Sequence, residues 1–527
     1  MLDNRHFPIV DLFAGPGGLG EGFSSHDLFR ILVSAEMDPS AHATLRLRAF
    51  YRILKRKNSA GLAAYYDFCN YGTPFPKSLA LDRAWLEASH EAQQLTLGKA
   101  EDNLKLDQLI QAGGVSPDKT WVLIGGPPCQ AYSLVGRARN RGKVDYKPEE
   151  DHRHFLYKEY LRIIQKYRPA IFVMENVKGI LSSSVNGERI FNTILQDLVD
   201  PDRALGQPQS AVGYRIYSLS HPVSFDRSTD PSTVDPKKFI VKAENYGIPQ
   251  ARHRVILLGV REDIDVREIR PLVPAPSFIA VRDALLGLPA RRSHLSRKAD
   301  IADEWLTVVA KHFSDLEKAA RKRKLNDLSD AFLMHSKRLN GDLSTGELRS
   351  SKVNNTSRMD PLSIWYNDPA LKVWLNHEVR GHMPSDLLRY AYAAVYAEVN
   401  GRSPTGHTEF DLLEQLRPAH ANWESGKFSD RFRVQRANSP STTITSHISK
   451  DGHYFIHPDP AQCRSLSVRE AARLQTFPDN YFFQGNRTQQ FHQVGNAVPP
   501  LLARKIAEIV LSILANQNPV QMKRHAA

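Results

Sequence analysis

The chain has 527 residues, of which 41% are hydrophobic and 24% are charged. This composition is typical of a globular protein with a large core and room for two or more domains. It excludes a disordered chain, a collagen-like repeat and a fibrous protein. Lys and Arg number 70 against 57 Asp and Glu, so the formal net charge is +13. Such an excess favours a polyanionic partner, although composition alone does not distinguish nucleic acid from an acidic protein or a membrane surface.

The cysteine content and the apolar runs indicate the cellular setting. Cys69, Cys129 and Cys463 are too few and too scattered for a disulfide framework or a cysteine-based zinc site. The N-terminus lacks the apolar segment of a secretory signal, and the longest apolar runs, such as residues 255–260, have the length of a strand and cannot span a bilayer. We therefore expect a soluble, cytoplasmic protein without a metal site.

Short apolar runs alternate with helical stretches through the first half of the chain. We expect buried strands in the run that begins at Phe7 and in residues 30–36, 121–125, 170–175 and 254–260, with helices that include 21–28 and 153–167. This alternation predicts an α/β fold with a doubly wound, mostly parallel sheet of the Rossmann-like kind. Residues 40–120 are longer than a simple crossover needs, so a helical insertion is expected there.

The alternation of strands and helices fades between about residues 264 and 481. This stretch contains basic clusters at 291–292 and 321–324 and a helical segment at 386–399, and helical periodicity returns at 501–514. The cluster at 321–324 is as consistent with a solvated helix face as with contacts to phosphate groups. We expect a first domain of residues 1–265, completed by residues 485–520, and a second, smaller domain of residues 266–484.

A glycine-rich loop follows the first expected strand. Gly15, Gly17 and Gly20 have the spacing of a dinucleotide-type fingerprint, in which glycines allow a tight turn and a close approach of the backbone to a ligand at a helix N-terminus. Glu36 ends the next strand, where it can accept hydrogen bonds from ribose hydroxyls. A structural turn is the alternative, but the combination predicts an adenosine-containing cofactor. The loop itself leaves NAD and S-adenosylmethionine open.

Cys129 stands on a stiff turn directly after the third expected strand, in Gly-Gly-Pro-Pro-Cys-Gln. Ligands of an open α/β sheet bind beyond the carboxyl ends of its strands, and two prolines restrict the backbone that carries the sulfur. A buried, inert cysteine is the commoner fate of a free thiol, but a loop tip of this kind is seldom part of a core. We therefore favour a functional Cys129.

An acid and two arginines border the same crevice. Glu175 lies at the carboxyl end of the next strand, where a partly desolvated carboxyl could give a proton to a ring nitrogen; a solvated strand-end glutamate is equally consistent. Arg252 and Arg254 alternate with His253, so both arginines can face one side and His253 the other. A guanidinium can hold a carbonyl or phosphate oxygen, whereas a surface ion pair is the simpler interpretation for His253.

Taken in order, these segments resemble the DNA cytosine-5 methyltransferases of prokaryotic restriction–modification systems. The matching segments are the glycine loop from Asp11, the cysteine turn, the Glu175 and Arg252/Arg254 motifs, a scaffold motif at 469–479 bordering a target recognition domain, and a last cofactor motif at 493–498. The resemblance implies S-adenosylmethionine rather than NAD. It implies cofactor contacts from Asp11, Phe13, Ala14, Gly15, Gly17, Gly18, Glu36, Met37, Pro127, Asn496, Ala497 and Val498.

The same resemblance implies roles for the remaining residues. The Cys129 thiolate would add to C6 of a flipped cytosine while Glu175 protonates or hydrogen-bonds N3, Arg254 would hold O2, and Arg252 would brace the nucleophile loop. Phe13 would stack on the cofactor adenine, Asn496 would tie the last motif to the loop and cofactor, and Gln130 and Ser133 would contact DNA. Lys99 stands where the family is expected to supply an acid at the adenine edge.

Other functions remain open at this level. An RNA cytosine-5 methyltransferase shares the chemistry, but one RNA-acting branch carries Pro-Phe-Thr where Ala131, Tyr132 and Ser133 stand here, which favours DNA. A non-catalytic DNA-binding relative is disfavoured by the joint presence of the cysteine, acid and arginine motifs, and an NAD oxidoreductase is a distant third. We expect duplex DNA as the partner, with a separately encoded restriction endonuclease, no membrane and a monomeric enzyme.

Overall fold

The computed structural model describes residues 6–57, 59–128, 156–185, 188–266, 269–352, 360–417, 423 and 431–517. Every structural statement below concerns these residues. Cys129, Gln130 and Ser133, which the sequence singles out as nucleophile and DNA contacts, lie outside them.

The centre of the protein is a sheet of nine described strands in the order β3-β2-β1-β4-β5-β12-β8-β9, with β10 paired to β12. Strands β1 to β5 are parallel, whereas β12 runs antiparallel to β5, β8 and β10. The expected α/β fold with a mostly parallel sheet is confirmed. The strands are β1 (Phe7–Leu12), β2 (Phe29–Glu36), β3 (Ala92–Gln94), β4 (Val122–Gly125), β5 (Ile171–Val177), β8 (Tyr214–Ser218), β9 (Ser224–Phe225), β10 (Ile240–Lys242) and β12 (His253–Arg261).

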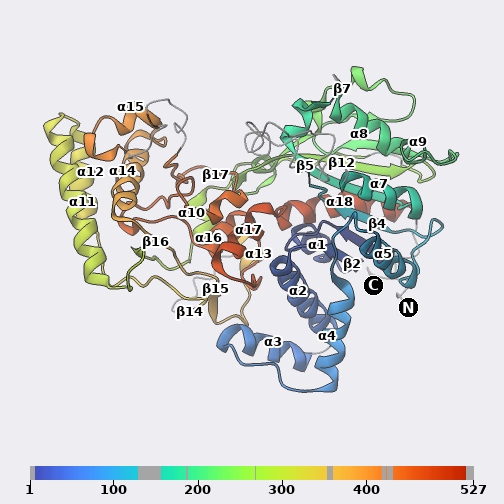
Figure 1. Ribbon diagram of the computed structural model, residues 1–527, viewed down its shortest axis with the longest axis horizontal. Helices are drawn as coiled ribbons and strands as arrows, with labels where there is room; N and C mark the ends of the chain where they lie inside the picture. Colours follow the sequence, from blue (N-terminus) through green and yellow to red (C-terminus); the bar gives the residue numbers. More distant parts are fainter. Residues whose placement is uncertain are drawn as a thin grey trace.

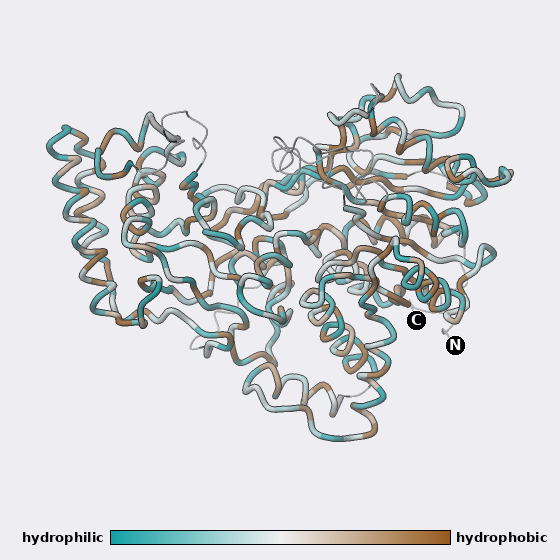
Figure 2. Tube along the Cα trace, viewed as in Figure 1, coloured by the Kyte–Doolittle hydropathy of each residue, from teal (hydrophilic) through white to brown (hydrophobic). Residues whose placement is uncertain are grey.

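Helices cover both faces of this sheet, because its strands are apolar on both sides (Figures 1 and 2). One face packs on α1 (Gly18–Ser24) and α18 (Pro500–Gln517). The other packs on α5 (Ala100–Ala112), α7 (Leu156–Tyr167) and α8 (Ile190–Val199). The strand order reverses between β1 and β4, and in such folds ligands bind at the carboxyl ends of the strands beside this switch point.

Residues 40–120 contribute both helices and a strand. The helices α2 (Pro39–Lys57), α3 (Ser59–Tyr71) and α4 (Leu79–Glu91) share an apolar cluster with Val373 and Leu375 of β15, far along the chain. The remainder of the stretch supplies β3, which lengthens the sheet, and α5, which covers it. The crossover is therefore long because three helices are inserted before β3.

A second lobe, residues 269–483, extends away from the sheet (Figure 1). Its far end is a helical layer of α11, α12 and α14 around Trp305, Phe332 and Tyr392. Helix α16 in this lobe and α17, which follows it, share an apolar cluster with α10 and α13. The bounds are α10 (Val281–Leu285), α11 (Ala302–Lys322), α12 (Asn326–Ser336), α13 (Pro361–Tyr366), α14 (Pro384–Asn400), α15 (Gly406–Phe410), α16 (Val468–Leu474) and α17 (Arg487–Asn496).

The remaining α-helix and strands are short. They are α9 (Pro201–Ala204), β6 (Ser184–Val185), β7 (Glu188–Arg189), β11 (Gln250–Ala251), β13 (His294–Leu295), β14 (Arg349–Ser351), β15 (Val373–Leu375), β16 (Gly381–His382) and β17 (Ser441–Thr442). The parallel pairing of β11 with β17 joins the chain just before β12 to the end of the second lobe. None of the helices in the described part of the chain has both the length and the apolar character needed to cross a bilayer.

Candidate active site

The glycine loop is held by the acid that ends β2. Glu36 accepts the backbone N–H of Gly15 at 2.8 Å with one carboxylate oxygen and that of Asp38 at 2.7 Å with the other. Burial raises the pKa of Glu36, although these backbone donors oppose the rise. Gly15 has φ +57° and open space where a side chain would stand. The carboxylate therefore shapes the loop, and its remaining lone pairs can still accept ligand hydroxyls.

The last cofactor motif returns to this loop from the far end of the chain. A Cβ atom at Gly18 would overlap the carbonyl oxygen of Val498, so only glycine allows the start of α1 to approach this segment. Ala497 is buried, whereas Asn496 is exposed and its side-chain nitrogen lies 3.3 Å from Nδ1 of His492. The two segments that the resemblance assigns to the cofactor are thus adjacent.

Asp11 lies beneath the glycine loop with no exposed surface. Neither of its carboxyl oxygens has a hydrogen-bond partner among the described residues. Burial raises the pKa of Asp11 to about 8; Arg52 opposes the rise, and the nearby acids Glu36 and Glu91 add to it. The side chain is therefore largely protonated at neutral pH, as an isolated buried carboxyl must be.

The end of β3 brings a residue that the sequence analysis did not single out beside Glu36. Strand β3 ends at Gln94, which pairs in register with Glu36 and is exposed. Lys99, to which the expected acid was aligned, is instead the residue before α5. Gln94 is therefore the side chain that the fold places beside Glu36, and the short polar strand that carries it gave no signal in the sequence. Met37, 58% exposed, and Phe13, with φ +56°, lie on the same edge.

Glu175 and Arg254 meet at the carboxyl end of β5. Arg254 Nε lies 2.8 Å from Glu175 Oε1, and the two side chains are 15% and 12% exposed. The described start of the cysteine turn lies against them, because a Cβ at Gly126 would be 3.2 Å from Glu175 Oε2. Asn176 Nδ2 donates to the Pro127 carbonyl at 3.3 Å. The fold thus brings the acid, the arginine and the base of the turn together.

Arg252 has a different environment from Arg254. It is 3% exposed and donates from Nη1 to the carbonyls of Ile444 at 2.9 Å and Gly495 at 3.4 Å. Burial and the charge of Arg254 lower the pKa of Arg252. His253 Nε2 lies 2.6 Å from Glu244 Oε1, a polar contact of the simple kind that the sequence suggested. Arg252 therefore ties the second lobe and the last cofactor motif to β12; its bracing of the nucleophile loop stays a prediction.

The two described cysteines do not compete with Cys129 for a chemical role. Cys69 and Cys463 are 0% and 2% exposed. Burial raises the pKa of both thiols, which suppresses the reactive thiolate. Neither thiol is available to a substrate at the edge of the sheet.

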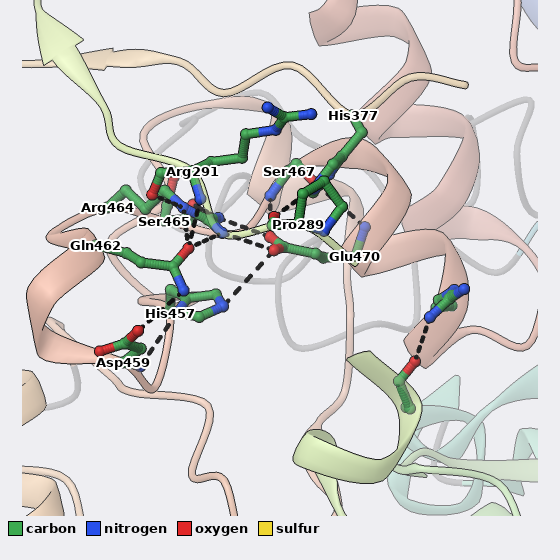
Figure 3. Close-up of polar contacts among 12 residues, drawn as sticks. Pro289, Arg291, His377, His457, Asp459, Gln462, Arg464, Ser465, Ser467 and Glu470 are labelled. Carbon is green, nitrogen blue, oxygen red and sulfur yellow. Dashed lines mark hydrogen bonds and ion pairs between the residues drawn. The ribbon is translucent and has the colours of Figure 1, made fainter. Parts of the chain in front are cut away.

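A buried polar cluster anchors the scaffold motif (Figure 3). Helix α16 begins with a capping box in which Ser467 accepts the Glu470 N–H and Glu470 accepts the Ser467 N–H. Glu470 also forms an ion pair with Arg464 at 2.7 Å, and although burial opposes it, Arg464 lowers the pKa of Glu470. His377 lies 2.8 Å from the Ser467 hydroxyl. Burial lowers the pKa of His377 to about 3 and that of His457 to about 4, so both are neutral.

A doubly wound sheet with a glycine loop at its switch point and an acid–arginine pair nearby is typical of α/β enzymes that bind a nucleotide-type cofactor. Residues 108–202 and 235–512 match the profile of the C-5 cytosine-specific DNA methylases. The chain belongs to this family and is a DNA cytosine-5 methyltransferase.

Similar proteins span almost the same length. The type II methyltransferase M.Bpa9945I of Bacillus paralicheniformis is 31% identical over 96% of this chain and 99% of its own. M.AgeI of Thalassovita gelatinovora, also described as a type II methyltransferase, is 28% identical over 95% and 98% of the two chains. A crystal structure described as a DNA modification methyltransferase from an E. coli prophage shares the fold, with a TM-score of 0.51 and 19% identity over 96% and 99% of the chains.

Proposed function

We propose that this enzyme transfers a methyl group from S-adenosylmethionine to C5 of a cytosine that is flipped out of a specific duplex DNA sequence, through a covalent adduct with Cys129. The observation that carries the proposal is the Glu175–Arg254 pair, which lies at the carboxyl end of β5 against the start of the Pro-Pro-Cys turn. A carboxyl beside a guanidinium matches the N3 and O2 edge of cytosine.

The residues at the sheet edge fit S-adenosylmethionine. Glu36 ends β2, where its free lone pairs can accept hydrogen bonds from the ribose hydroxyls. Gln94 offers an amide and Met37 an apolar contact for the adenine, and Gly15 leaves open space for a ligand. Val498 closes the cleft against Gly18. When bound, the sulfonium supplies an electrophilic methyl group that the activated C5 accepts.

The side chains supply the activation of the pyrimidine. Cytosine C5 is a poor nucleophile until the Cys129 thiolate forms a bond to C6 and the electrons of the C5–C6 double bond move to C5. Arg254 engages Oε1 of Glu175, which leaves Oε2 to hydrogen-bond or protonate N3. Loss of the C5 proton and cleavage of the sulfur–C6 bond then restore the aromatic ring. Arg252 holds the surrounding backbone through the carbonyls of Ile444 and Gly495.

The rest of the chain serves the DNA. We assign residues 1–265 and 485–520 to the catalytic domain and residues 266–484, including the 465–480 scaffold motif, to target recognition. Exposed basic side chains such as those at 321–324 suit phosphate contacts. Extrusion of the base costs a few kcal/mol, which contacts to the duplex must offset. We infer a monomeric, cytoplasmic enzyme that protects host DNA against a separately encoded endonuclease, as the type II relatives suggest.

Two assays test the proposal. Cys129→Ser abolishes transfer of tritiated methyl to unmethylated genomic DNA, whereas tRNA accepts none from the wild type. DNA that contains 5-fluorocytosine traps the wild-type enzyme as a denaturation-resistant adduct, because fluorine blocks the final elimination. Full activity of Cys129→Ser, or the absence of an adduct with an active wild type, contradicts the covalent route.

A further inference from the structure

Two fully buried glutamines connect the cofactor segment with the strand that carries the arginines. Gln250 lies on β11, two residues before Arg252, and Gln475 follows α16; both are 0% exposed. Gln250 Nε2 donates to Gln475 Oε1 at 3.0 Å and to the Leu474 carbonyl at 3.1 Å. The two side chains therefore form a direct amide–amide contact across 225 residues of sequence.

The outer ends of this pair reach the two halves of the site. Gln475 Nε2 donates to the Val494 carbonyl at 2.7 Å and to the Ala497 carbonyl at 3.3 Å. Gln250 Oε1 accepts the Ile444 N–H at 2.7 Å. The carbonyl of the same Ile444 accepts Arg252 Nη1. A continuous series of buried hydrogen bonds thus runs from the last cofactor motif to the arginine motif.

Close backbone packing makes this connection stiff. A Cβ at Gly495 would overlap the backbone of Thr445 and Ser446, so α17 and the segment after β17 touch without an intervening side chain. Thr443 Oγ1 donates to the Ala251 carbonyl at 2.7 Å. A displacement of the cofactor segment must therefore move the 441–446 segment and β11 with it, because each buried donor and acceptor loses its partner otherwise.

We infer that Gln250 and Gln475 are positioning residues that couple cofactor binding to the placement of Arg252 and Arg254. This inference deepens the proposed function and rests on it. Cofactor bound at Ala497 fixes the amide relay (Val494/Ala497–Gln475–Gln250–Ile444–Arg252), and the fixed Arg252 holds the backbone two residues before Arg254, whose guanidinium receives the base. Neither glutamine touches cofactor or substrate itself.

Glutamate variants break the relay with almost no change of shape. Gln475→Glu places an oxygen where two carbonyls need a donor, and we expect the dissociation constant for S-adenosylmethionine to rise about tenfold or more without DNA present. Because a buried glutamate is readily protonated, affinity recovers as the pH falls from 8 to 6, which a general loss of structure would not produce. Gln250→Glu lowers kcat and also weakens cofactor binding.

Gln435→Glu is the matched control. Gln435 is also 0% exposed, accepts the Thr442 N–H at 2.8 Å and donates to the Tyr454 carbonyl at 2.7 Å, but it does not reach the cofactor segment. We expect a similar loss of thermal stability with unchanged cofactor affinity. The double variant Gln250→Glu/Gln475→Glu should bind cofactor as tightly as the single variant with the lower cofactor affinity, since the two substitutions break the same relay.

Hydrogen exchange of the cofactor-free protein tests the relay by a measurement that does not depend on catalytic activity. In Gln250→Glu, the peptide that spans 494–498 exchanges faster although the substituted side chain does not touch it; in Gln435→Glu it does not. Three results overturn the inference while wild-type methylation still stands. They are equal cofactor affinity in wild type and Gln475→Glu, a weakening of cofactor binding by Gln435→Glu as large as that by Gln475→Glu, and additive losses of cofactor affinity in the double variant. A wild type that neither binds S-adenosylmethionine nor methylates DNA refutes the proposed function instead.

Discussion

Replacement of Asp11 by asparagine isolates the effect of one buried carboxyl. Asp11 has no exposed surface and no hydrogen-bond partner for either oxygen among the described residues, and burial raises its pKa to about 8. Between the unfolded pKa of 3.8 and this folded pKa, the folded protein holds a proton that the unfolded chain releases. The contribution of Asp11 to stability is therefore complete below pH 3.8 and is lost as the pH rises toward 8.

The magnitude follows from the width of that window. One bound proton changes the free energy of unfolding by about 1.4 kcal/mol per pH unit, or about 3 kcal/mol between pH 5 and pH 7. Asp11→Asn cannot ionise and lacks this slope. The stability of Asp11→Asn relative to wild type should therefore increase by about 3 kcal/mol over the same interval, because all other titrating groups are common to both proteins.

Urea unfolding followed by intrinsic fluorescence at pH 5, 6, 7 and 8 measures the difference. Asp479→Asn is the control, because its effect on stability should have the opposite sign. Asp479 is 1% exposed, and although burial opposes it, the ion pair with Arg473 at 2.8 Å lowers the pKa of Asp479. That variant should lose about 3–5 kcal/mol at pH 7. Parallel pH profiles for wild type and Asp11→Asn would show that Asp11 is ionised when folded and would refute the reasoning from burial.

Three further substitutions probe the site. Arg254→Met leaves the carboxylate of Glu175 buried without its cation, so methyl transfer should fall at least a hundredfold in the tritium assay while cofactor affinity changes less than threefold. Arg48→Met removes the 2.9 Å contact to Glu21 on α1 and should cost about 3–5 kcal/mol in urea unfolding; unchanged stability would contradict the importance of this buried pair. Gly18→Ala forces α1 away from the last cofactor segment and should abolish cofactor binding in calorimetry, whereas Gly114→Ala, in open space at the surface, should not.

The main strands could be predicted from the sequence because each is a local apolar run. Residues 30–36, 121–125, 170–175 and 254–260 fall on β2, β4, β5 and β12 with shifts of one or two residues. Strand β3 could not be found in this way, because it has three residues, two of them glutamine. That omission left Gln94 unnoticed, since without β3 no strand end marks its position beside Glu36.

Residue types in the site could be predicted, whereas their partners depend on the topology. Glu175 and Arg254 were expected in one crevice, and the antiparallel pairing of β5 with β12 brings them to 2.8 Å. No local sequence pattern indicates that Arg252 donates to the carbonyls of Ile444 and Gly495, or that Gln250 donates to Gln475. These contacts connect segments about 200 residues apart, and buried amides give no periodic signal in a sequence.

Part of the net charge of +13 comes from buried arginines with structural roles. Arg252 and Arg469 are 3% and 0% exposed, and both donate hydrogen bonds to backbone carbonyls: Arg469 donates to those of Leu375, Pro478 and Tyr481. Burial lowers the pKa of both groups, so they are held in place by carbonyl dipoles at a cost in desolvation. Such guanidiniums fix the junction of the two lobes and cannot neutralise phosphates. Only exposed basic groups can attract a polyanion, so a count of charges overstates that attraction.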